Sequence, residues 1–257
     1  MSDPELHRVG GGEAAVFSGR CPGKGSANED AAAIVAFGDD ACVLIVADGM
    51  GGERAGQEAA ALAIREMRSA IGEAEREGWM LRTAIMNGIE RANQGVLELG
   101  IGAGTTLAAV ELQDGAVRPY HVGDSTILLV GQRGKVKLQT VAHSPVGFAV
   151  EAGVLDASEA MHHEDRHLVS NMVGVPDMRI EVGSSRRLAP LDTLLLASDG
   201  LSDNLHTEEI IECIRTGSLA DAARQLVRDA RRRMEEPVEG EPSKPDDLTF
   251  VGFRRGR

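Results

Sequence analysis

Aromatic residues are scarce in this 257-residue chain, which has one Trp, one Tyr and five Phe. Its core must therefore consist of Leu, Val, Ile and Ala, within a hydrophobic fraction of 42% that is typical of globular proteins. No apolar run approaches membrane-spanning length, and the first residues lack the basic and apolar segments of a signal peptide. We therefore expect a cytoplasmic protein that does not bind membranes.

Cysteine is nearly absent as well. Cys21, Cys42 and Cys213 are odd in number and far apart, which argues against a disulfide framework, and no CxxC pair indicates zinc. None of the three is followed six positions later by Arg, the spacing of a thiolate phosphatase loop, and no DxDxT-like nucleophile motif occurs. Chemistry through a covalent phosphoenzyme is therefore not expected.

Positive charge is also in short supply, since the formal net charge is −13. This balance argues against binding to nucleic acid or to anionic membranes. An excess of carboxylates favours solubility, and it is also what a divalent-cation site requires. The positions of the acids must distinguish these two roles.

Apolar periodicity predicts strands at Ala31–Phe37 and Ala41–Ala47, which are separated by the turn-forming residues 38–40. From about Ala55 the period is helical, and two amphipathic helices are expected. Gly10–Gly12 are too permissive for a firm element, so residues 1–13 are expected to form a flexible arm. The apolar faces of the two helices are Ala59, Leu62, Ala63 and Met67 in the first, and Leu81, Ile85, Ile89, Ala92 and Val96 in the second.

The middle of the chain carries the clearest sheet signals. Asp114-Gly115 predicts a hairpin, and "STILLV" is expected to pair with "KVKLQTV" across a short turn, so the neighbouring strands must be antiparallel. Pro119 is expected at a sheet edge or a bulge. Residues 143–180 are irregular and are expected to form a surface flap. The whole chain, 1–257, is predicted to be one α+β domain with antiparallel sheets covered by helices.

Thr207 is expected to cap one short helix, and Ser218 with Asp221 to cap the next. The runs "TLLLA" before Asp199 and "LTFVGF" after Asp247 are expected to be strands.

Acidic residues recur where the predicted strands begin or end. Aspartate is common at turns, so each case alone is typical of local structure. Together, however, they would converge if these strand ends face the same way. The residues are Glu29, Asp30, Asp48, Asp124, Asp199, Asp246 and Asp247.

Several carboxylates cannot remain ionised in a partly buried pocket without compensation, because like charges repel and desolvation adds to the cost. A bound cation is the simplest remedy. Ligands that are all oxygen select Mg²⁺, Mn²⁺ or Ca²⁺, and the lack of neighbouring His or Cys argues against zinc. Gly49 lets the backbone approach closely, so its carbonyl is a further candidate ligand.

Six short motifs occur along nearly the whole chain: "NEDA" (28–31), "VADGMGG" (46–52), "GTTL" (104–107), "VGDS" (122–125), "SDGLSDNL" (198–205) and "DDLTFV" (246–251). In order and spacing they resemble the protein phosphatase 2C family. Each motif is moderately specific, whereas the ordered set is strongly specific. The resemblance, which is to bacterial-type members, implies metal-dependent serine/threonine phosphatases with a four-layer αββα sandwich.

The resemblance also implies roles for individual residues. Asp48 would bridge two Mn²⁺ or Mg²⁺ ions, with Asp199 and Asp246 completing the shell of the second, and these three are the candidate catalytic residues. The Gly49 carbonyl would bind one of the two ions, and Glu29 would hold metal-bound water. Asp124 resembles the ligand of a third, weaker ion, and Asp30 has a supporting role. A metal-bridging hydroxide would attack phosphoserine or phosphothreonine directly.

Two positions depart from the family pattern. Gly25 occupies the place, four residues before Glu29, where many members carry a phosphate-binding Arg, so Lys24 is the candidate substrate-binding residue. Met50 stands where animal members have a His proposed as general acid, although bacterial-type members commonly read "DGMGG". The expected partners are phosphoproteins, substrates of a serine/threonine kinase in signalling, and the enzyme is expected to be a monomer. The alternative is a phosphatase-like scaffold with weak or no turnover.

Overall fold

The computed structural model describes residues 3–256, and two large sheets form its centre. The strands of the first, called sheet A, are β1 (Glu5–Val9), β2 (Gly12–Gly19), β9 (Thr126–Val130), β10 (Val136–Gln139), β13 (Thr193–Ala197) and β14 (Leu248–Arg255). Their order across the sheet is β1-β2-β14-β13-β9-β10, and each neighbouring pair is antiparallel. The strand that ends the described chain therefore lies at the centre of sheet A.

The second sheet, called sheet B, lies against sheet A. Its strands are β3 (Ala31–Phe37), β4 (Ala41–Ala47), β7 (Leu107–Gln113), β8 (Ala116–Val122), β11 (Glu181–Val182) and β12 (Arg186–Arg187). The order is β11-β8-β7-β4-β3, again antiparallel. β12 also pairs with β8, at its other end from β11. A separate small ladder joins β5 (Gly49–Met50) to β6 (Gly104–Thr105).

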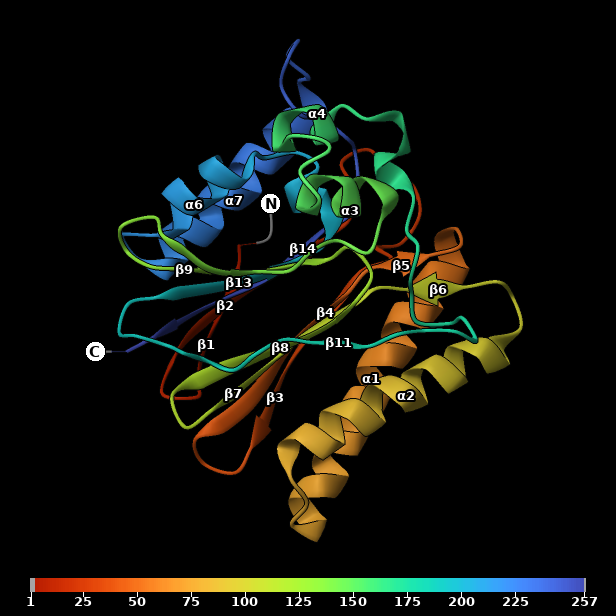
Figure 1. Ribbon diagram of the computed structural model, residues 1–257, viewed down its shortest axis with the longest axis vertical. Helices are drawn as coiled ribbons and strands as arrows, with labels where there is room; N and C mark the ends of the chain where they lie inside the picture. The colour runs from red at the N-terminus through yellow and green to blue at the C-terminus, as the bar shows by residue number, and fades with distance from the viewer. Residues whose placement is uncertain (1–2, 257) are drawn as a thin grey trace.

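Helices cover the outer face of each sheet (Figure 1). On sheet B lie α1 (Glu53–Glu77) and α2 (Leu81–Leu99), and on sheet A lie α6 (Thr207–Ile214) and α7 (Leu219–Glu235). The predicted four-layer αββα sandwich is therefore confirmed. The remaining helical segments are α3 (Pro145–Glu151), α4 (Ala157–Met161), the 3-10 turn η1 (Glu164–His167) and α5 (Asp199–Ser202). Among residues 3–256, no helix is both long and apolar enough to span a membrane.

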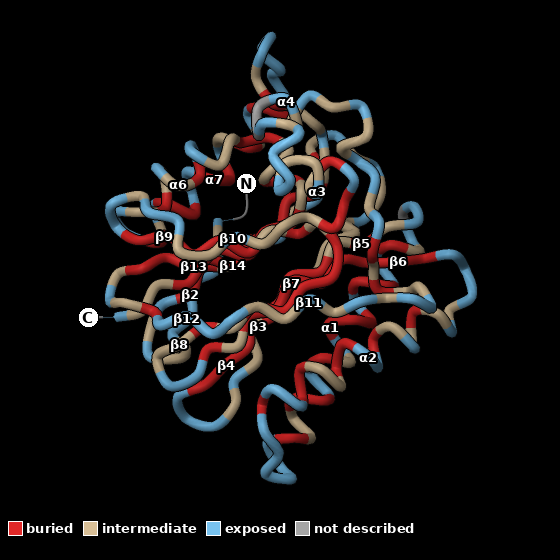
Figure 2. The backbone as a smooth tube through the Cα atoms, viewed as in Figure 1, coloured by how far each residue is buried: buried red, intermediate tan, exposed pale blue. Residues whose placement is uncertain are grey.

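Three apolar clusters fill the spaces between the four layers. β4 shows the principle, because each of its residues is buried and alternate side chains serve different clusters. Val43 and Ile45 pack toward α1 and α2, whereas Leu44 and Val46 pack between the sheets. Figure 2 shows this burial running along β4 and β7. An aliphatic core thus suffices, as the scarcity of aromatic residues required.

Several sequence predictions are confirmed in detail. β3 and β4 have the predicted bounds and pair across residues 38–40. The hairpin at Asp114-Gly115 has φ values of 53° and 69°, which are the two positive values of a type I′ turn. Ser218 accepts a hydrogen bond from the Asp221 amide and caps α7, as expected.

The flexible arm predicted over residues 1–13 is wrong for the described part of that range. β1 pairs with β2 in register, with Val9 opposite Gly12, and Gly10 and Gly11 make the tight turn at φ values of 56° and 68°. The glycines are permissive, as expected, but here they supply the positive φ angles of a hairpin. Residues 1–2 lie outside the described residues.

Three local predictions are refined. Pro119 lies in β8, the strand next to the sheet edge, where the pairing partner changes from β11 to β12. This position avoids a ladder hydrogen bond that proline cannot donate. The cap of α6 is His206, one residue before the predicted Thr207. Residues 143–180 contain α3, α4 and η1, joined by irregular segments.

Candidate metal centre

Strand pairing places acidic residues together at one end of each sheet. In sheet B, Ala31 is opposite Ala47, so Asp30 and Asp48 lie at the same end of the β3-β4 pair. In sheet A, Ala197 is opposite both Thr126 and Phe250. The segments that carry Asp124, Asp199 and Asp246 therefore leave β9, β13 and β14 at a common end.

The acids of the two sheets lie close together, and Asp48 of sheet B is near acids from both sheets. Burial raises the pKa of the Asp48 carboxyl well above its ordinary value, and the nearby carboxylates raise it further. Those carboxylates are Asp30 from sheet B, and Asp199, Asp124 and Asp246 from sheet A. Like charges from different strands have thus been brought close together, as the sequence predicted.

Two further acids share this environment. Burial raises the pKa of Asp30 to about 7, and the Asp199 charge adds to this effect against a hydrogen bond from the Ser198 hydroxyl at 2.8 Å. Burial, followed by the Asp199 charge, likewise raises the pKa of Asp124 to about 7. Asp30 is therefore a half-buried member of the acidic set and accepts the hydrogen bond that anchors Ser198, the residue that precedes Asp199.

Gly49 occupies a position that no other residue could take without movement of the backbone. A Cβ atom there would lie 2.2 Å from the Gly56 carbonyl oxygen and 2.6 Å from that of Glu29. A Cβ at Gly56 would lie 2.6 Å from Glu29 Oε2. The two glycines therefore let α1 begin close against Glu29, beside Asp48.

Lys24, the predicted substrate-binding residue, lies at the edge of the acidic set. Its Nζ is 3.1 Å from Glu29 Oε1 and 2.8 Å from Asp247 Oδ2, and these carboxylates raise its pKa despite partial burial. Asp247 also accepts hydrogen bonds from the backbone amides of Cys21 and Glu29, at 2.7 and 2.8 Å. Asp247 thus holds the segment that contains Lys24, and the phosphate contact of Lys24 stays a prediction.

Lys244 is a member of the site that was not predicted from the sequence. Its Nζ lies 2.5 Å from Asp199 Oδ2, 2.9 Å from Asp203 Oδ2 and 3.2 Å from Asp246 Oδ2. Two signals pointed to it: Lys244 is two residues before Asp246, and Asp203 follows Asp199 at a helical i+4 spacing.

His143, from the segment after β10, was also missed. Its Nδ1 accepts a hydrogen bond from the Gly123 amide at 3.1 Å, so its Nε2 carries the proton and faces Glu181 at 3.2 Å. His121, His143 and Glu181 place potential ligand atoms within 4.8 Å of one another. A protonated Nε2 does not suit a metal ligand, however, and the hydrogen bond instead positions the turn that carries Asp124.

The chemistry of the converging donors fits a hard divalent cation. The acids around Asp48 offer carboxylate oxygen, and their mutual repulsion is what a cation would relieve. Burial, together with the charge of Asp199, also raises the pKa of Asp246, which has the same need for compensation.

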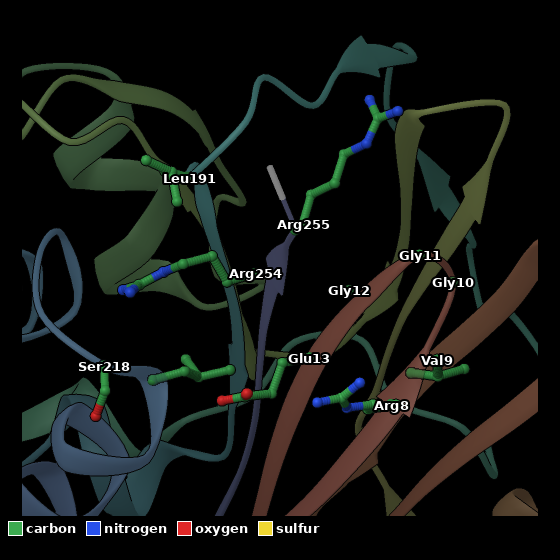
Figure 3. Close-up of a pocket in the computed structure, with 12 residues that line it drawn as sticks. Arg8, Val9, Gly10, Gly11, Gly12, Glu13, Leu191, Ser218, Arg254 and Arg255 are labelled. Atoms are coloured by element: carbon green, nitrogen blue, oxygen red, sulfur yellow. The ribbon is translucent and has the colours of Figure 1, made fainter.

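A cavity of about 650 Å³ lies at the opposite end of sheet A (Figure 3). It is bordered by the β1-β2 turn, by Arg254 and Arg255 at the end of β14, and by Ser218 at the start of α7. None of the described residues that line it is a predicted metal ligand. The acidic set therefore lies elsewhere, at the other end of the strands.

Comparisons with known proteins give a family and several solved relatives. A model of the protein phosphatase 2C family matches residues 20–238. The serine/threonine phosphatase Stp of Listeria monocytogenes is 31% identical over 201 residues, covering 74% of this chain and 78% of that protein. The S. agalactiae serine/threonine phosphatase superimposes with a TM-score of 0.80 at 28% identity, covering 95% of this chain and 99% of the other. A structure of the PstP catalytic domain, in complex with two manganese ions, gives 0.73 at 27% identity, covering 95% and 98%.

Proposed function

The chain belongs to the protein phosphatase 2C family, and from this premise we propose that it is a metal-dependent serine/threonine protein phosphatase. The convergence of carboxylates from the ends of both sheets on Asp48 is the observation that carries the proposal. Aspartates that only form turns would not be brought so close together, because their charges repel one another. The substrates would be phosphoproteins modified by a serine/threonine kinase, and the enzyme would act as a monomer.

The residues of this chain would hold two Mn²⁺ or Mg²⁺ ions. Asp48 would bridge both, Asp199 and Asp246 would complete the shell of the second, and the Gly49 carbonyl would bind one of them. Glu29 would act from the outer shell, and Asp124 would hold a third, weaker ion. When bound, such ions supply an activated water and a clamp for the phosphoryl group. The PstP structure in complex with two manganese ions supports the number of principal sites.

The protein's own contribution is to position the groups of the site. Buried strand ends keep the carboxylates in place, and Gly49 and Gly56 let the backbone approach Asp48 and Glu29. Lys24 would add positive charge near the phosphate, supplied from a segment held by Asp247. Binding of the phosphate would weaken the two ion pairs that Lys24 makes, because the ammonium would be shared among more anions.

The deciding experiment is hydrolysis of a phosphothreonine peptide with and without Mn²⁺. We expect metal-dependent turnover, and we expect Asp199→Asn to reduce kcat at least about 100-fold because it removes a ligand charge. Asp39→Asn, in the exposed turn at the far end of β3 and β4, is the matched control and should retain full activity.

Undiminished activity in excess EDTA, or equal rates for Asp199→Asn and the wild type, would refute the proposal. Tight binding of Mn²⁺ without turnover would instead favour the phosphatase-like scaffold.

A further inference from the structure

Lys244 places one ammonium group among three carboxylates, of which Asp199 and Asp246 belong to the acidic set. The side chain is 26% exposed, and those of Asp199 and Asp203 are 22% and 20% exposed, so solvent screens these ion pairs only in part. The Lys244 Nζ lies within 3.2 Å of an oxygen of each of the three carboxylates, so the ammonium is held among them by geometry.

The backbone around Lys244 is held firmly, so the contact does not depend on a mobile loop. The Asn204 side chain, fully buried, donates a hydrogen bond to the Lys244 carbonyl and accepts one from its amide, both at 2.8 Å. The Asn204 side-chain nitrogen also donates a hydrogen bond to the Gly200 carbonyl at 2.9 Å. On the other side, the Ser243 hydroxyl donates to the Arg233 carbonyl of α7. Lys244 is thus anchored to the segment that carries Asp199 and Asp203.

The three partners of Lys244 are not equivalent. Asp199 and Asp246 are the two acids assigned to the shell of the second ion, whereas Asp203 has no assigned metal. An ion that takes the oxygens of Asp199 and Asp246 must compete with the ammonium for them and repels it at short range. Lys244 can keep its ion pair with Asp203 after the divalent ion has bound Asp199 and Asp246.

From this arrangement we propose that Lys244 is an internal cation that competes with the second divalent ion and sets the metal concentration the site requires. The proposal rests on the proposed function, since it takes Asp199 and Asp246 as ligands of that ion. When divalent ions are scarce, Lys244 offsets the repulsion among the carboxylates and keeps the strand ends together. When ions are abundant, it stays on Asp203. Metal binding and this ion pair are thus coupled, and each weakens the other.

The test is calorimetric titration of Lys244→Met with Mn²⁺ beside the wild type. Removal of the competitor should tighten binding of the second ion about tenfold, the order of coupling between sites that share a charge. Lys137→Met is the matched control: Lys137 pairs with the buried Asp192 at 2.6 Å, at the other end of β13. It changes net charge equally and should leave Mn²⁺ affinity unchanged. Lys244→Arg keeps the charge and should stay near the wild-type affinity.

Thermal unfolding gives a second readout that does not depend on turnover. In EDTA, Lys244→Met should melt below the wild type, and saturating Mn²⁺ should raise its melting temperature by more than it raises that of the wild type. Unchanged or weaker Mn²⁺ binding, or a variant that stays unfolded in saturating Mn²⁺, would overturn the proposal. A wild type that binds Mn²⁺ without hydrolysing phosphopeptide would defeat the proposed function while leaving the competition measurable.

Discussion

At Gly25 the chain has room for a side chain that it does not carry. The residue is exposed, and a Cβ atom there would meet nothing within 4 Å. The resemblance implies a phosphate-binding Arg at this position in many family members, so we expect phosphate binding by this chain to depend on other groups. Lys24, the preceding residue, already forms ion pairs with Glu29 and Asp247.

We expect Gly25→Arg to lower KM for a phosphothreonine peptide about tenfold with little change in kcat, because a guanidinium makes paired, charge-assisted hydrogen bonds to phosphate. The measurement is steady-state kinetics in saturating Mn²⁺. Ala27→Arg, exposed two residues further on, adds the same charge and should leave KM almost unchanged. An unaltered KM in Gly25→Arg would mean that phosphate is held elsewhere.

At the scale of elements, the site depends on how closely two segments approach. α5 begins at Asp199, and the segment before β14 crosses it so tightly that a Cβ at Gly200 would lie 1.9 Å from the Asp247 carbonyl oxygen. Glycine is thus needed because of packing between distant segments. The "SDG" motif shows the glycine, but only the fold shows its neighbour.

Gly200→Ala should therefore destabilise the protein by about 2–4 kcal/mol and reduce activity, because separation of the two segments also separates Asp199 from Asp246. Urea unfolding and phosphatase assays measure the two effects. Gly72→Ala, in α1 with its nearest neighbour 3.6 Å away, should stabilise by about 0.5–1 kcal/mol through helix propensity. Similar behaviour of the two variants would contradict this account.

Elements that are specified by neighbouring residues in the sequence were predicted well. β3 and β4 pair across a turn-forming segment, and Asp114-Gly115 has the backbone angles its sequence demands. The β1-β2 hairpin was missed because its glycines carry no register of their own. The position of β2 is set by its pairing with β14, which lies at the other end of the sequence. Propensity acts over a few residues and cannot report such a partner.

At the scale of the whole molecule, the half-buried acids of the metal centre make stability depend on pH. The pKa values of Asp30 and Asp124 rise from an ordinary 3.8 to about 7 on folding. Between these values the folded state binds more protons than the unfolded state, so the free energy of unfolding falls as pH increases. Each such group contributes at most about 1.4 kcal/mol per pH unit.

In EDTA we therefore expect the protein to resist urea better at pH 5 than at pH 8. Saturating Mn²⁺ should shrink or reverse the difference, because the ion binds the ionised carboxylates. Asp124→Asn, which removes one of the raised groups, should flatten the dependence measured in EDTA. Greater stability at pH 8 in EDTA would show that the acids are not forced together.

Residue order along the chain was enough to predict the recurrence of acids at strand ends, the antiparallel connections and the family. These depend on turn chemistry, periodicity and spacing, which are properties of neighbouring residues. The folded structure was needed to show that Lys244 contacts Asp199 across 45 residues, that Asp247 accepts a hydrogen bond from the Glu29 amide across 218, and that His143 holds the turn before Asp124. Such contacts depend on strand register and on the packing of layers, and neither is written within any one segment.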